Sequence, residues 1–246
     1  MDSMIPIIGL TLRALTRSRR LIVVALLLLI PALLALVFRL SSGDVTGDRF
    51  ALRLFGLLAL PLLLPLTSLI LATSALGGEL DDKTLPYLTL KPIARLSVVA
   101  AKYVATALVC AALVEVALVA MYVVGAAGAI QGQTLTALLL AGLAGCLAYT
   151  AVFLPLGLFL PRQGLIVGIL YVVIWEGIAA GFSTGLATLS VRRYVEGTLH
   201  MGLGASPLAT LAPSSLSGAT SLLVIGGIVL LGVLVCTWRL RTLEMP

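Results

Sequence analysis

The chain has 246 residues, of which 61% are hydrophobic and 11% charged, and its mean hydropathy is +1.19. Soluble domains carry about 25% charged and 45–50% apolar residues, so the composition excludes an ordinary soluble domain and indicates an integral membrane protein. The net charge of +6 does not indicate nucleic-acid binding, because the basic residues flank apolar runs, where membrane orientation signals belong. Crossing a bilayer takes about 20 apolar residues in a helix, so the chain has room for about six spans.

The first 20 residues predict a helix that lies on the membrane surface. Apolar side chains recur at helical spacing along one face of residues 5–15. The basic side chains gather on another face, and they are Arg13, Arg17 and Arg20. This amphipathic pattern is typical of an interfacial helix whose arginines anchor it at headgroup level. The alternative is a plain positive flank in front of the first span.

Six apolar runs follow in chain order. They cover about residues 21–38, 52–76, 97–124, 135–160, 165–182 and 221–238. We therefore expect an all-α integral membrane protein with six transmembrane helices, forming a single domain over residues 1–246. Pro61 and Pro65 lie inside the second run, where each removes a backbone donor and favours a kink. Residues 183–220 form a less apolar stretch, rich in Ser, Thr, Gly and Pro.

The basic residues predict the orientation of the spans. Six spans place both termini on one side of the membrane. If that side is the cytoplasm, eleven of the basic residues face it and five face outward, as the positive-inside rule favours. We therefore expect a multi-pass protein of the plasma (inner) membrane with both termini in the cytoplasm.

Residue types that carry catalysis or nucleotide binding are scarce. His200 is the one histidine, so a zinc-binding HExxH helix is excluded, and an intramembrane protease would need His200 as its base. No G-x-x-x-x-G-K-[ST] loop occurs, so nucleotide phosphates have no such site here. The cysteines fall inside apolar runs and indicate small buried side chains. We expect no catalytic residue, metal or cofactor in this chain.

Two carboxylates lie inside apolar runs, Glu115 in the third and Glu176 in the fifth. A carboxylate at this depth is costly and normally faces the bundle interior or a water-filled cavity. The functional interpretation is a group on the path of a transported molecule. The structural interpretation is a hydrogen bond to a neighbouring helix, or a protonated acid. Both residues are therefore candidate pathway groups.

The densest charge lies between the second and third runs, in "GGELDDKTLPYLTLKPIAR", residues 77–95 (the charged segment). Asp82 or Thr84 can cap a short helix that has Pro86 in its first turn, and Pro92 then stops this helix. These features predict a short, stiff element at the cytoplasmic surface, of the kind that binds another protein.

The spacing E-x4-T-L-x2-L-x3-P-x2-R-x6-K resembles the pattern after the second span of type-2 ATP-binding-cassette (ABC) permeases, the membrane subunits of exporters. The matching positions are Glu79, Thr84, Leu85, Leu88, Pro92, Arg95 and Lys102. The similarity also covers the basic surface helix, the six spans and the polar stretch between the last two. The chain departs from the family pattern at Lys83, where the family often has glycine, and this basic residue bears on which ATPase is accepted.

The resemblance implies a permease that pairs with a second copy or a homologous permease above two cytosolic ATPase subunits, which bind ATP and Mg²⁺. It implies that a short coupling helix after the second span contacts each ATPase. It also implies that residues 183–220 form short helices at the external face. The implied ATPase-coupling residues are Glu79, Asp81, Asp82, Lys83, Thr84 and Leu85. We expect Arg95 and Lys102 to anchor the third span at headgroup level, and the nearly uncharged spans favour an amphiphilic or lipid-like cargo.

Two other functions stay open from the sequence. A six-helix substrate-binding subunit of a vitamin-type importer would bind a small ligand tightly without an ATPase. A membrane enzyme would lose turnover when a serine or His200 is replaced.

Overall fold

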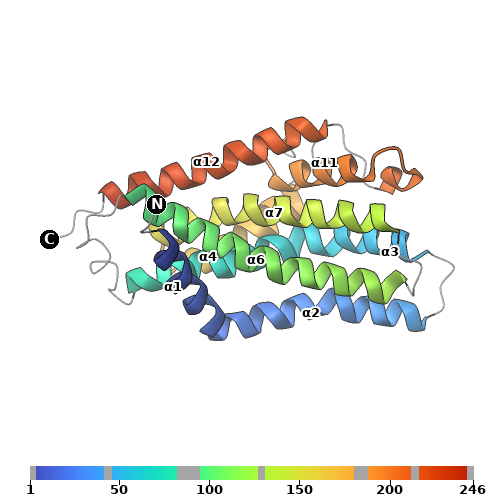
Figure 1. Cartoon of the computed structure of the whole chain (residues 1–246), viewed down its shortest axis with the longest axis horizontal. Helices are drawn as coiled ribbons and strands as arrows, with labels where there is room; N and C mark the ends of the chain where they lie inside the picture. The colour runs from blue at the N-terminus through green and yellow to red at the C-terminus, as the bar shows by residue number, and fades with distance from the viewer. Residues whose placement is uncertain are drawn as a thin grey trace.

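The computed structural model of the chain describes residues 4–41, 46–81, 95–126, 131–179, 188–211 and 216–242. Within these ranges the chain forms helices and no strand (Figure 1), which confirms the all-α prediction for the described residues. The elements are α1 (Met4–Arg17), α2 (Arg19–Leu40), α3 (Gly47–Leu54), the π-helix η1 (Phe55–Leu63), α4 (Leu64–Asp81), α6 (Arg95–Ala126), α7 (Gly132–Phe159), α8 (Gly164–Tyr171), the π-helix η2 (Val172–Ala179), α11 (Val191–Leu203), the 3-10 helix η3 (Pro207–Leu211) and α12 (Gly218–Thr242).

Among the residues that the structure describes, five helical stretches are long and apolar enough to cross a membrane. They are Arg20–Leu40, Gly47–Leu76, Arg95–Ala126, Gly132–Phe159 and Gly218–Thr242. Each coincides with one of the six predicted spans. The remaining predicted span, 165–182, corresponds to α8 and η2, whose apolar helix Gly164–Gly177 is shorter than the other five. Five candidate spans are therefore present, and the crossing by α8 and η2 stays a prediction.

The long helices lie side by side and alternate in direction (Figure 1). The C-terminal ends of α4, α7 and α12 and the start of α6 lie at the end of the bundle that carries α1, here called the α1 end. The opposite end carries α3 and α11 and is called the α3 end. The flanks of the charged segment therefore lie at the α1 end.

The α8–η2 stretch packs antiparallel against the second span. A Cβ added to Gly164 would lie 3.6 Å from Cγ2 of Thr73, and one added to Gly168 would lie 2.1 Å from Cδ1 of Leu69. Further along, η2 contacts η1.

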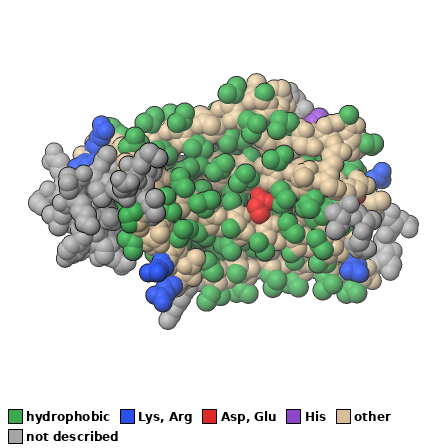
Figure 2. All heavy atoms as spheres, in the orientation of Figure 1, with side chains coloured by type: hydrophobic (Ala, Val, Ile, Leu, Met, Phe, Trp, Pro, Cys, Tyr) green, Lys and Arg blue, Asp and Glu red, His purple; other side chains and the backbone are tan. Residues whose placement is uncertain are grey.

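The outer face is apolar between two basic ends. Figure 2 shows Lys and Arg side chains at both ends of the molecule and, between them, a belt of hydrophobic side chains with an acidic side chain near its middle. Leu57, Val116 and Leu223 are 78%, 70% and 76% exposed. Soluble monomers rarely expose large contiguous apolar patches, so this surface fits lipid or a partner subunit as its surroundings.

The N-terminal helix carries the amphipathic pattern that the sequence predicts. Ile7 and Leu15 are buried, whereas Arg13 and Arg17 are exposed, as is Arg20 at the start of α2. The buried face of α1 packs against α6. The basic face thus remains available to headgroups, and its role as a membrane anchor stays a prediction.

Candidate coupling site

The predicted ATPase-coupling residues surround the C-terminal end of α4. Glu79 and Asp81 belong to the last turn of this helix. Four of the predicted coupling residues lie outside the described residues, and they are Asp82, Lys83, Thr84 and Leu85. The predicted short coupling helix lies outside the described residues as well. Its contacts with an ATPase therefore stay a prediction. The residues on either side of it belong to α4 and α6.

Two basic side chains in the first turns of α6 bind main-chain carbonyls of neighbouring helices. Arg95, the first residue of α6, donates from Nη1 to the carbonyl oxygen of Leu240 in α12 at 2.7 Å. Lys102 donates from Nζ to the carbonyl oxygen of Ala75 in α4 at 3.0 Å. The start of α6 is therefore tied to the last turns of both helices.

The burial of Lys102 differs from that of an outward-facing anchor. Lys102 is 1% exposed and lies in the contact between α6 and α4. The sequence favours headgroup anchoring for Lys102 because a basic residue near a span end usually extends toward the interface. Here Lys102 and Arg95 each have a protein acceptor, and headgroup anchoring by either residue stays a prediction.

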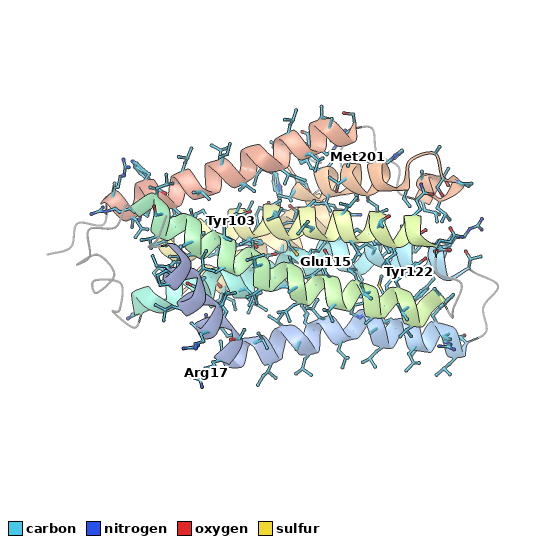
Figure 3. The ribbon with its side chains drawn as sticks, viewed as in Figure 1. Arg17, Tyr103, Glu115, Tyr122 and Met201 are labelled. Atoms are coloured by element: carbon cyan, nitrogen blue, oxygen red, sulfur yellow. The ribbon has the colours of Figure 1, made fainter. Side chains whose placement is uncertain are left out.

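A third donor from the same part of α6 binds α7. The hydroxyl of Tyr103 (Figure 3) donates to the carbonyl oxygen of Leu147 at 3.0 Å. Three side chains within the first nine residues of α6 thus hold three different helices, α12, α4 and α7. The motif spacing singled out the two basic residues, whereas no sequence signal indicated the tyrosine.

Glu176 binds the N-terminus of α11. Its carboxylate, in a residue that is 0% exposed, accepts hydrogen bonds from the backbone N–H groups of Val191 at 3.1 Å and Arg192 at 3.3 Å. It also accepts from the hydroxyls of Ser190 at 2.5 Å and Tyr171 at 3.2 Å. The first N–H groups of a helix lack intrahelical partners, and negative charge is favourable at this end of the helix dipole. Glu176 therefore joins η2 to α11.

These partners give Glu176 the structural interpretation that the sequence left open. The sequence does not indicate these partners. They lie 14 to 16 residues further along the chain, and the stretch between has no periodicity that would place them beside Glu176. The partners do not test whether Glu176 also contributes to a transport path.

Glu115 lies in α6 between Tyr103 and Tyr122 (Figure 3). Among the described residues, neither of its buried carboxylate oxygens has a hydrogen-bond partner. The carboxylate lies against α7, where a Cβ added to Gly142 would come within 2.9 Å of Oε1. The space left by Gly142 accommodates the acid. Glu115 thus lies in the contact between α6 and α7, a different helix contact from that of Glu176.

The second and fifth predicted spans meet through two π-helices, η1 and η2. Pro61 lies inside η1 and cannot donate a backbone hydrogen bond, which accounts for a departure from α-helical geometry there. η2 contains no proline, so its geometry has no comparable sequence signal. Isolated π-helical turns are frequent at functional sites, and these two segments pack against each other.

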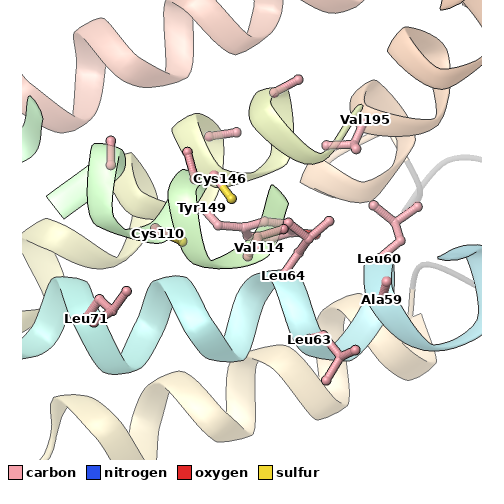
Figure 4. Close-up of a cluster of buried hydrophobic side chains, with 14 of the residues drawn as sticks. Ala59, Leu60, Leu63, Leu64, Leu71, Cys110, Val114, Cys146, Tyr149 and Val195 are labelled. Atoms are coloured by element: carbon pink, nitrogen blue, oxygen red, sulfur yellow. The ribbon is translucent and has the colours of Figure 1, made fainter. Parts of the chain in front are cut away.

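The core beside these helices is apolar with a few hydroxyl and thiol groups. Figure 4 shows Leu64 of α4, Val114 of α6 and Val195 of α11 meeting around the same cluster, with Cys110 and Cys146 close to each other. Cys110 Sγ lies 3.3 Å from the hydroxyl oxygen of Ser68. The free cysteines of the chain are all buried, as the sequence predicts. Over the described ranges, no group of three or more potential ligands is arranged to hold a metal ion.

Comparison with known proteins identifies one family. A family model described as "ABC-2 family transporter protein" matches residues 15–177 of the chain. The match begins near the end of α1 and ends within η2, so it includes the charged segment, Glu115 and Glu176. No match was found among curated proteins.

Proposed function

Because the chain belongs to the ABC-2 family of transporter proteins, we propose that it is the permease subunit of an ABC exporter and forms the translocation pathway as a dimer. The chain is a helical membrane subunit with five candidate spans, of a family that is typically non-catalytic and associates with ABC ATPase subunits. The observation that carries the proposal is the family match, which covers the charged segment and both of its flanking helices.

Two cytosolic ATPases bind ATP and Mg²⁺ in this proposal, and the charged segment contacts them. The coupling residues are Glu79, Asp81, Asp82, Lys83, Thr84 and Leu85. Closure of the ATPase pair displaces this segment, and the displacement enters the bundle through α4 and α6. The permease then changes between two arrangements because ATP favours one of them. The position of both flanking helix ends at the α1 end supports this route.

The pathway lies at the dimer interface, lined by the second and fifth predicted spans. The contact between η1 and η2 supports this assignment, since it places the second and fifth predicted spans next to each other. Glu115 and Glu176 are the candidate pathway carboxylates. The cargo is amphiphilic or lipid-like, which the apolar spans and the apolar outer face support.

The test replaces residues 79–85 by a Gly/Ser linker of equal length. We expect the variant to lose co-purification with the ATPase and permease-dependent ATP hydrolysis, because the linker removes the charged contact surface. The matched control is an equal Gly/Ser replacement of residues 204–210 at the α3 end, which should keep both properties. Unchanged assembly and hydrolysis after replacement of residues 79–85 would contradict coupling through this segment.

A further inference from the structure

We propose that the start of α6 is a clamp that transmits movement of the charged segment to α4 and α12, with Arg95 and Lys102 as its positioning residues. The clamp comprises these two side chains and their carbonyl acceptors, Leu240 and Ala75. The inference rests on the proposed coupling function and goes beyond it, because it names the residues that carry the movement into the bundle.

The bond from Arg95 reaches the end of α12. Leu240 lies two residues before Thr242, the last residue of this helix. The last four carbonyls of a helix lack intrahelical N–H partners, and a cation is favourable at this end of the helix dipole. Arg95, the last residue of the charged segment and the first of α6, satisfies one of these carbonyls. A displacement at the end of the segment therefore acts on α12.

The bond from Lys102 reaches the other flank of the segment. Ala75 lies in the C-terminal part of α4, the helix that ends at Asp81 within the segment. Burying an ammonium group is costly unless it is hydrogen-bonded or paired. The carbonyl of Ala75 in α4 therefore stabilises the Lys102 ammonium group in its buried position. The same short stretch of α6 thus holds α4 before the segment and α12 at its far end.

The surroundings of Lys102 favour a mechanical role over a purely interfacial one, whereas Arg95 is itself exposed. Arg13 and Arg17 of α1 are exposed, as basic residues that face headgroups are. Lys102 is buried among helices instead. Tyr103 joins the next residue of α6 to Leu147 in the central helix α7. The start of α6 is therefore bonded to α7 as well as to α4 and α12.

The test compares Lys102→Met and Arg95→Met, which keep most of the side-chain volume and remove the donor, with Lys102→Arg and Arg95→Lys, which keep a cationic donor. The matched control is Arg53→Met, which removes an exposed cation from α3 at the opposite end. Each full-length permease is reconstituted in nanodiscs with the ATPase that co-purifies with the wild-type chain. ATPase affinity, kcat and KM for ATP are then measured.

We expect the two Met variants to bind the ATPase and ATP within about twofold of the wild type while kcat falls about tenfold, the size expected for one charged hydrogen bond used in the coupling step. The conservative variants should restore kcat to within about threefold of the wild type, and Arg53→Met should leave it unchanged. A Met variant with wild-type kcat, or a loss that the conservative variants do not restore, overturns the assignment.

A second measurement does not need the ATPase. Spin labels at Asp81→Cys and Arg241→Cys report the distance between the ends of α4 and α12, because the native cysteines are buried. The Met variants should broaden the distance distribution and the conservative variants should keep it narrow. Failure of the wild-type chain to recruit any ATPase contradicts the proposed function, whereas a narrow distribution in both Met variants contradicts the clamp.

Discussion

The two carboxylates of the apolar helices differ in their hydrogen-bond partners. Glu176 accepts four hydrogen bonds, two of them from backbone N–H groups at the start of α11. Glu115, within the described ranges, has none. A hydropathy scale gives both glutamates the same value, so the difference in their hydrogen bonding arises from the fold. The acid with partners stabilises a helix junction, and the acid without partners adds no such contact.

The same substitution should therefore have different effects at the two positions. Glu176→Gln places an amide N–H₂ among donors that need an acceptor, and we expect it to lower the free energy of unfolding by about 2 kcal/mol. Glu115→Gln should change it by less than about 0.5 kcal/mol, since no hydrogen bond of the carboxylate is lost. Chemical denaturation in detergent micelles measures both. Equal losses at the two positions would contradict the distinction.

At the scale of the helices, the packing of α8 against α4 depends on a single glycine. A Cβ at Gly168 would lie 2.1 Å from Cδ1 of Leu69 and 3.0 Å from its Cγ, and Leu69 is fully buried. We expect Gly168→Ala to destabilise the protein by about 1–3 kcal/mol, because the added methyl group forces the two helices apart. Thermal unfolding of the purified protein measures the loss.

Gly226 of α12 provides the matched control for this prediction. Nothing lies within 4 Å of a Cβ added there, so Gly226→Ala should be neutral or stabilise the helix by up to about 1 kcal/mol. Combining Gly168→Ala with Leu69→Ala should cost less than the sum of the single losses, because the second change makes room for the first methyl. Strict additivity would show that the two residues do not contact each other.

The helices differ in how far the sequence predicts them. Long apolar runs predict six spans, and five of these runs coincide with described helices that are long and apolar enough to cross a membrane. The apolar run 165–182 predicts where α8 and η2 lie, but the π-helical geometry of η2 has no comparable signal, since η2 contains no proline. The motif located Arg95 and Lys102 by spacing. Their acceptors in α12 and α4 are main-chain carbonyls, which no side-chain pattern can indicate.

At the scale of the whole molecule, the number of crossings decides on which side each terminus lies. Five crossings would place the two ends of the chain on opposite sides of the membrane, and six would place them on the same side. In the bundle, α7 ends at the α1 end and α12 begins at the α3 end (Figure 1), with α8 and η2 running antiparallel to the second span between them. This arrangement favours a sixth crossing by the stretch that contains α8 and η2.

Single cysteines at Arg17, Gln131 and Arg241 test this count, because all three positions are exposed and the native cysteines are buried. With six crossings and the basic α1 end in the cytoplasm, an impermeant maleimide should label Arg17→Cys and Arg241→Cys in inside-out vesicles. It should label Gln131→Cys in right-side-out cells, because residue 131 precedes α7 at the α3 end.

Labelling of positions 17 and 241 from opposite sides would show that α8 and η2 do not cross. The charged segment would still lie at the α1 end, but α12 would have to leave the bundle arrangement seen here, and the bond from Arg95 to Leu240 could not form in the membrane.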